Sequence, residues 1–288
     1  MRRVDLGEIE DQGWCPAWLR DAMTGYLQVV IEQTQVYRSA APAVAALLNA
    51  TKSHKVLDLA SGAGGPWPRL LQQIQAAGAA PDVTLSDLRP NRAAAIRFEA
   101  EEGFHYLTHR VSALNVPEAL DGVRTMFSAL HHFSRAEVRA ILMAAQRQGI
   151  GFAGFEATHR SVRGLLVTAF IPLLVLLMMP RVRPRRWGTL LLTYLPPIVP
   201  LLIWWDGVAS TLRTHSASEL RALVGEIAEP GYSWSVAEVS IAGAPLPVLQ
   251  VIGRPERVAQ TDDGGRQPPS SANAAGWTAG ATSRSSQS

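Results

Sequence analysis

The sequence is poor in cysteine and carries little excess charge. Its 288 residues include one cysteine, Cys15, which by itself can form neither a disulfide framework nor a cysteine-based metal site. The formal net charge of +3 is too small to favour a nucleic-acid partner. Residues 1–18 become acidic where the apolar core of a signal peptide would have to lie, so no signal peptide is predicted. We therefore expect a protein of the reducing cytoplasm, or of the cytoplasmic side of a membrane.

Acidic residues are absent between Glu156 and Asp206, and this gap is strongly apolar. Two apolar arms, interrupted by prolines, flank a basic turn that contains Arg181, Arg183, Arg185 and Arg186. Each arm falls short of the roughly 20 apolar residues that a membrane-spanning helix needs. These features favour a hydrophobic insertion, residues 164–205, that dips into one leaflet with its arginines at anionic headgroups. The alternatives are a spanning hairpin and a soluble apolar lid or dimer seam.

Short apolar runs alternate with helix-like stretches before this insertion. The runs span 55–60, 82–87, 105–111, 123–127 and 150–157, and the predicted helices span 66–78, 90–103 and 134–149. This alternation predicts a parallel α/β sheet. After the insertion, a helix at 216–228 precedes β-rich runs at 233–243 and 246–255, which we expect to pair antiparallel. Both flanks of the insertion then belong to one sheet, and a spanning hairpin would carry its arginines across the membrane, against the positive-inside bias.

The ends of the chain differ from this central part. Residues 1–50 are predicted to form an N-terminal helical cap, and 51–257 the main domain. Residues 258–288 are rich in glycine, serine, proline and alanine and have almost no branched apolar residues. Such a segment buries too little surface to offset its ordering entropy, so it is predicted to be disordered.

The stretch VLDLASGAGG carries the first indication of chemistry. Asp58 lies near the end of a predicted buried strand, and Gly62 and Gly64 allow a sharp turn into the next helix. Such a turn brings backbone N–H groups and a helix N-terminus against a ligand. A dinucleotide-binding fingerprint would need a third glycine where Trp67 stands, which disfavours an NAD-dependent oxidoreductase.

The arrangement resembles motif I of class I S-adenosylmethionine (SAM)-dependent methyltransferases, an acidic residue followed by G-x-G-x-G, with Ala60 in place of the first glycine. Asp87 stands where that family places the acidic residue that binds both ribose hydroxyls. Ser112 occupies a loop where the family usually has an aspartate near the adenine. The stretch MFSALHHFS matches the motif that holds the methionine end of the cofactor. The resemblance implies cofactor binding by Asp58, Ala60, Ser61, Gly62, Gly64, Asp87, Leu88, Ser112, Ala113 and Leu130.

The family resemblance also implies a fold and a function. We expect a Rossmann-like seven-stranded sheet with its last strand antiparallel and with the hydrophobic insertion after the fifth strand. The expected function is a SAM-dependent methyltransferase, membrane-associated and acting on a small hydrophobic or lipid-like acceptor. A non-catalytic, membrane-anchored binding module that retains the fold is the alternative. The oligomeric state stays open.

Two adjacent histidines are the candidate catalytic residues. His131 and His132 follow the fourth predicted strand, and an unperturbed imidazole can act as a general base near neutral pH. The alternative is a structural pair without chemistry. The other histidines considered, His105, His109 and His215, lack the spacing of metal ligands, so no metal site is predicted.

Overall fold

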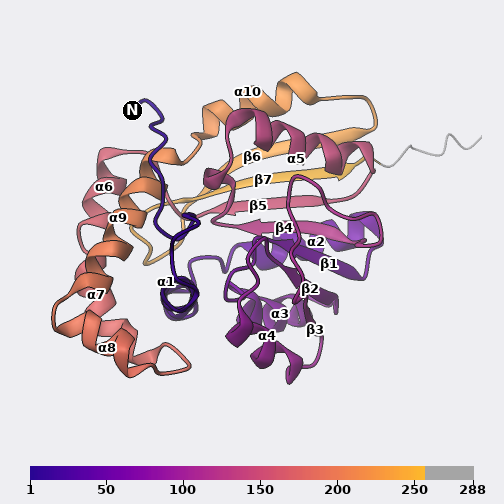
Figure 1. The fold of residues 1–288 in the computed structure, drawn as a ribbon. Helices are drawn as coiled ribbons and strands as arrows, with labels where there is room; N and C mark the ends of the chain where they lie inside the picture. The colour runs from indigo at the N-terminus through magenta and orange to yellow at the C-terminus, as the bar shows by residue number, and fades with distance from the viewer. Residues whose placement is uncertain (257–288) are drawn as a thin grey trace, which may run out of the picture. The chain divides into compact units, whose positions relative to one another are not determined.

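A seven-stranded sheet organises residues 1–256, which are the residues that the computed structural model describes (Figure 1). Its strands are β1 (Lys55–Leu59), β2 (Asp82–Ser86), β3 (Phe104–Tyr106), β4 (Val123–Phe127), β5 (Phe152–Glu156), β6 (Tyr232–Val239) and β7 (Val248–Pro255). The strand order is β3-β2-β1-β4-β5-β7-β6, and β7 runs antiparallel to both of its neighbours. The predicted sheet is confirmed. The predicted disordered tail, 258–288, lies outside the described residues.

Helices cover both faces of the sheet. On one face, α2 (Ala40–Thr51), α3 (Trp67–Ala76) and α4 (Arg92–Glu99) contribute to one hydrophobic core. On the other face, α5 (Arg135–Arg147) and α10 (Ala217–Ile227) contribute to a second core. Every residue of β4 and β5 is buried, as expected for strands covered on both faces. Both α5 and α10 begin with a capping box, formed by Ser134 with Glu137 and by Ser216 with Glu219.

The structure differs from the sequence-based expectation at three places. Helix α4 ends at Glu99 rather than at Gly103, and β3 is a three-residue strand. Helix α2 was predicted as part of the N-terminal cap, but it belongs to the layer of helices that packs on one face of the sheet. Its side chains Val44, Leu47 and Leu48 are buried in the first core. Only residues before α2 are therefore left to form a cap.

The insertion after β5 folds into several short helices that pack on α1 (Ala17–Thr34). These are α6 (Val162–Thr168), α7 (Ile171–Met178), the 3-10 turn η2 (Met179–Arg181), α8 (Trp187–Tyr194) and α9 (Ile198–Arg213). A third core joins Leu19 and Met23 of α1 to Val175, Val199 and Ile203 of the insertion. The N-terminal helix and the insertion thus stabilise one another.

Part of the insertion has the composition of a membrane segment. By length and apolarity, the stretch Val162–Arg181 could cross a membrane, with a mean hydropathy of 2.3 and 22% of it buried. Helices α8 and α9 would meet the same criterion together, but they are bent by 79° at the break between them. Such a bend is expected of a broken or re-entrant segment rather than of a straight span.

Candidate functional site

The loop after β1 is tied to the end of β2 by hydrogen bonds. Gly62 adopts a φ of +52°, in the left-handed region that favours glycine. Its N–H donates to Oδ2 of Asp87 at 2.8 Å, and the N–H of Arg89 donates to Oδ1 of the same carboxylate at 2.7 Å. Burial raises the pKa of Asp87 and these two backbone bonds oppose that shift. The two predicted elements, glycine loop and acidic residue, therefore meet at one edge of the sheet.

Two positions of the predicted motif have left-handed backbone conformations, one occupied by glycine and the other by alanine. Gly64 has a φ of +101°, and a side chain there would collide with the ring of Phe98. Its glycine is required by close packing against α4. Ala60 has a φ of +56°, a conformation that costs a residue with a side chain about 1–2 kcal/mol. The position where the resembled family has its first glycine is thus strained in this chain.

Asp58 supports the loop from behind. It is buried, and its Oδ1 accepts a hydrogen bond of 2.6 Å from Oγ1 of Thr125 on β4. Burial raises the pKa of Asp58 to about 6, partly offset by hydrogen bonds from Thr125 and Ser61. The side chain links β1 to the middle of β4.

A cavity of about 860 Å³ opens beside this loop. The predicted cofactor residues that line it are Ala60, Ser61, Gly62, Asp87, Leu88, Ser112 and Ala113. The other three predicted residues, Asp58, Gly64 and Leu130, are not part of its lining. Seven of the ten predicted residues therefore gather on one wall, which we call the polar wall.

Apolar residues of the lining come from elements that the sequence did not connect. Leu27, Val30 and Ile31 of α1 line the cavity together with Val167 of α6 and Leu174 of α7. We call this set the apolar wall. Sequence reasoning predicted a cap and an apolar insertion separately, but no local signal showed that they would face the same cavity.

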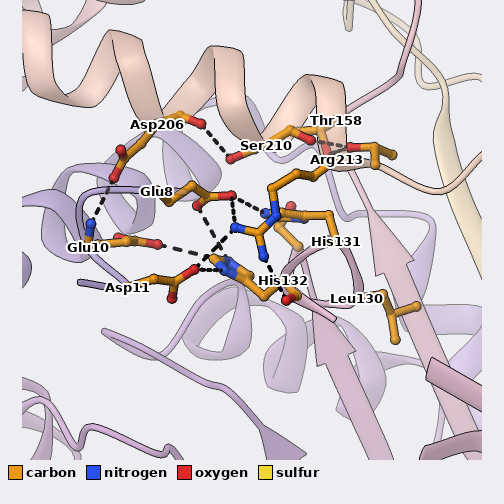
Figure 2. Close-up of polar contacts among 12 residues, drawn as sticks. Glu8, Glu10, Asp11, Leu130, His131, His132, Thr158, Asp206, Ser210 and Arg213 are labelled. Atoms are coloured by element: carbon orange, nitrogen blue, oxygen red, sulfur yellow. Dashed lines mark hydrogen bonds and ion pairs between the residues drawn. The ribbon is translucent and has the colours of Figure 1, made fainter. Parts of the chain in front are cut away.

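The two candidate catalytic histidines lie in the 3-10 turn η1 (Leu130–His132) and have different surroundings (Figure 2). His131 is buried, and its Nδ1 is 2.7 Å from Oε2 of Glu156 at the end of β5. The other carboxylate oxygen of Glu156 accepts a 2.6 Å bond from the N–H of Leu130. His131 does not line the cavity. Its position suits it to hold η1 against β5.

His132 lines the cavity, but its protonation is unfavourable for the predicted role of general base. Burial alone would lower the pKa of this imidazole, yet the carboxylates of Glu8, Asp11 and Glu10 together raise it to about 10. The Nδ1 of His132 is 2.8 Å from Oδ2 of Asp11. With these neighbours the imidazole keeps its proton at neutral pH and does not remove one from an acceptor.

The acidic neighbours come from the N-terminal segment, which α9 holds in place (Figure 2). Asp206 accepts the N–H groups of Ile9 and Glu10 at 2.7 and 3.1 Å. The guanidinium of Arg213 contacts Asp11 at 3.3 Å and donates to the carbonyl of His132 at 2.7 Å. The sequence showed only that the first 18 residues become acidic. It did not indicate which residues these acidic side chains would contact.

Comparisons with known proteins agree with the topology. No protein-family model matches the sequence, and no curated protein matches it. The structure of the plantazolicin methyltransferase BpumL in complex with SAH matches with a TM-score of 0.51 at 9% identity, over 83% of this chain and 96% of that chain.

Two further solved structures match less well. An O-methyltransferase (NcsB1) from neocarzinostatin biosynthesis matches at 18% identity over 75% of this chain, with a TM-score of 0.41. An O-methyltransferase family protein from Burkholderia thailandensis matches at 16% identity over 77% of this chain, with a TM-score of 0.45. This chain covers 53% and 57% of those two chains, little more than half of their length. The strand order and the match to BpumL show that the chain has the class I methyltransferase fold.

Proposed function

We propose that the protein is a SAM-dependent methyltransferase that acts on a small hydrophobic or lipid-like acceptor. The observation that carries this proposal is the cavity with two unlike walls. Asp87 and the loop after β1 lie on the polar wall, and α1 and the insertion supply the apolar wall. The fold supports the proposal, since the plantazolicin methyltransferase structure holds SAH, the demethylated form of SAM.

The residues of the polar wall fit a nucleoside cofactor. Each oxygen of Asp87 accepts one backbone N–H and keeps a further lone pair, so the carboxylate can still accept two ribose hydroxyls. The loop residue Gly62 has no side chain that would keep a ligand from its backbone. A volume of about 860 Å³ lies within the usual range of small-molecule pockets, about 300–1,000 Å³. When bound, SAM supplies an electrophilic methyl group on its sulfonium.

The chain's own contribution is to bind and orient the acceptor and to exclude water. Leu27, Val167 and Leu174 offer an apolar surface for this purpose. Because His132 keeps its proton, the proposal requires an acceptor that ionises without a protein base. An acidic hydroxyl on an apolar or aromatic body meets both requirements.

The insertion supports membrane association of the enzyme. Thirteen of the twenty exposed large apolar side chains in residues 1–256 belong to residues 162–205, including Phe170, Trp187 and Leu195. Arg183 and Arg185 are exposed beside them, and no acidic residue lies in the same segment. Exposed apolar side chains next to arginines that have no acidic residue in the same segment are typical of a segment that lies at the surface of an anionic membrane. The localisation that follows is the cytoplasmic face of a membrane.

Calorimetric titration with SAM and SAH tests the cofactor assignment. We expect one site, and we expect Asp87→Ala to weaken binding by about 1–3 kcal/mol because charge-assisted bonds to the ribose are lost. Asp82→Ala is the control, since Asp82 is exposed at the opposite end of β2. A wild-type protein that binds neither compound would exclude the proposed function.

The non-catalytic binding module is the second candidate. It is favoured by the strained Ala60 and by Ser112, a neutral side chain where the resembled family usually has an aspartate. Conversion of SAM to SAH in the presence of phenolic acceptors separates the two candidates. Binding without any conversion across a broad acceptor panel would support the module.

A further inference from the structure

The two imidazoles of η1 face a common carboxylate (Figure 2). Nε2 of His131 is 3.6 Å from Oε1 of Glu8, and Nε2 of His132 is 3.7 Å from Oε2 of the same side chain. One ligand atom from each of the three residues lies within 4.8 Å of the other two. Ligands about 2.1 Å from one tetrahedral ion are about 3.4 Å apart. The two contacts with Glu8, which involve its two different oxygens, are close to this spacing. With one atom from each residue, the three ligands would have to close in by up to about 1.4 Å to share an ion.

The far side of each imidazole is held by a second carboxylate. Nδ1 of His131 lies 2.7 Å from Glu156, and Nδ1 of His132 lies 2.8 Å from Asp11. Because a carboxylate accepts hydrogen bonds, each Nδ1 carries the hydrogen, and the neutral ring has its lone pair on Nε2. Outer carboxylates that fix histidine ligands in this manner are a general feature of metal sites.

This tautomer leaves lone pairs facing a negative charge. With neutral rings, both Nε2 lone pairs point toward the Glu8 carboxylate, an arrangement that is repulsive unless a cation lies between them. Glu8 is 1% exposed and His131 is 3% exposed, so water relieves little of this repulsion. A cation among these three atoms, a proton or a metal ion, is required by the geometry.

The charges around the site favour a cation with more than one positive charge. Three carboxylates, those of Glu8, Asp11 and Glu156, lie within 3.7 Å of the two imidazoles. The guanidinium of Arg213 contacts two of them, Glu8 at 3.5 Å and Asp11 at 3.3 Å. It offsets one negative charge, and the remaining two can bind another cation.

We propose that Glu8, His131 and His132 bind one divalent transition-metal ion, with Glu156 and Asp11 orienting the two histidines. Two imidazoles and one carboxylate suit zinc and iron(II) better than magnesium or calcium, which prefer oxygen ligands. The ion ties the N-terminal segment to η1 at the edge of the cavity, where His132 is part of the lining. This site does not depend on the proposed methyltransferase activity. A metal ion would take the place of the proton on Nε2 of His132, and in either state this imidazole cannot act as a base.

Zinc binding to the full chain, produced without a histidine tag and stripped with EDTA, tests the site. Competition with a chromophoric chelator gives stoichiometry and affinity. We expect one Zn²⁺ per chain, a higher melting temperature with Zn²⁺ than with EDTA, and at least about tenfold weaker binding by Glu8→Gln. Glu238→Gln is the matched control, because Glu238 also contacts a histidine, His159, at 3.1 Å, but on the surface.

Further readouts separate ligand loss from misfolding. Asp11→Asn keeps all three ligands and removes one orienting carboxylate, so it should weaken Zn²⁺ binding about 10–100-fold. Cobalt(II) bound to the wild type should show the visible absorption of nitrogen and oxygen ligands, and His132→Gln should lose it. Near-ultraviolet circular dichroism in EDTA shows whether each variant is folded. If Glu8→Gln does not fold, the other two variants decide the question.

Two results would overturn the site. One is a folded wild type that binds Zn²⁺ no tighter than about 10 µM, roughly −7 kcal/mol, the affinity expected of scattered surface ligands. The other is equal affinity in the wild type, Glu8→Gln and His132→Gln. SAH titration in EDTA is run on the same samples, so that loss of the metal site and loss of the cofactor site are told apart.

Discussion

The polar wall of the cavity comes from turns at the ends of neighbouring strands, whereas the apolar wall joins segments that are far apart in the sequence. Gly62 and Asp87 follow β1 and β2, two strands that pair in the sheet. Leu27 of α1 and Leu174 of α7 line the same cavity because the third core packs these helices together. Backbone hydrogen bonds fix the first wall and side-chain packing fixes the second, so the two walls should respond differently to substitution.

The largest expected effect is on the packing behind the apolar wall. Val175→Asp places an unpaired charge at a fully buried position between α1 and the insertion. We expect the free energy of unfolding to fall by about 3–5 kcal/mol, measured by urea denaturation. Leu173→Asp in the same helix is the control, since Leu173 is 55% exposed and should tolerate the charge. Equal stability of the two variants would show that this core does not hold the wall.

Asp58, which lies behind the polar wall, should make the free energy of unfolding depend on pH. Burial raises the pKa of Asp58 to about 6, above the value of about 4 expected in the unfolded chain. Protonated Asp58 therefore contributes stability that is fully present below about pH 4 and is lost as the pH rises through about 6. The loss amounts to about 3 kcal/mol.

Asp58→Asn should remove this dependence, because the amide does not titrate. Urea unfolding between pH 4 and 7 should show the wild type losing about 3 kcal/mol more than the variant. Asp82→Asn, at the exposed start of β2, should follow the wild type. Parallel curves for the wild type and Asp58→Asn would mean that Asp58 is ionised in the folded protein without cost.

The outer surface of the insertion is tested with vesicles. Replacing Arg183 and Arg185 with glutamine should weaken binding to mixed phosphatidylcholine and phosphatidylserine vesicles by about 2 kcal/mol, roughly 30-fold. Raised salt should mimic the change. Arg139→Gln on α5, away from the insertion, should bind as the wild type does. A wild type that stays soluble and does not sediment with vesicles would favour the soluble lid.

The smallest expected effect concerns the strained loop of the polar wall. Ala60→Gly relieves the left-handed conformation of residue 60 but adds freedom to the unfolded chain. The net gain in unfolding free energy should be about 0.5–1 kcal/mol. Ala63→Gly in the same loop has no such strain to relieve and should destabilise. If both variants lose stability alike, the loop of the folded protein does not hold Ala60 in this conformation.

The sequence predicted most of the sheet because its signals were local. Short apolar runs between helix-like stretches gave β1, β2, β4 and β5, and the capping boxes at Ser134 and Ser216 gave the starts of α5 and α10. Parallel pairing then brought the loop after β1 to Asp87. Helix α2 was assigned to the cap because its alanine-rich sequence does not show which surface it covers.

The surroundings of the histidines could not be predicted in the same way. His131 and His132 are adjacent in the sequence, yet one contacts Glu156 of β5 and the other contacts Asp11 of the N-terminal segment. These partners are fixed by tertiary packing, including the bonds from Ile9 and Glu10 to Asp206. Since no short-range pattern encodes such contacts, the raised pKa of His132 was not foreseen.

Hydrogen exchange of the protein with and without saturating SAH tests most directly whether the polar wall holds the cofactor. We expect slower exchange of backbone amides at 60–63, 65, 87–89, 112–114 and 128–129, in the turns that line the polar side of the cavity. The insertion, residues 164–205, should exchange at an unchanged rate, because the apolar wall is left for the acceptor. Protection confined to the insertion, with the four turns unaffected, would contradict this account.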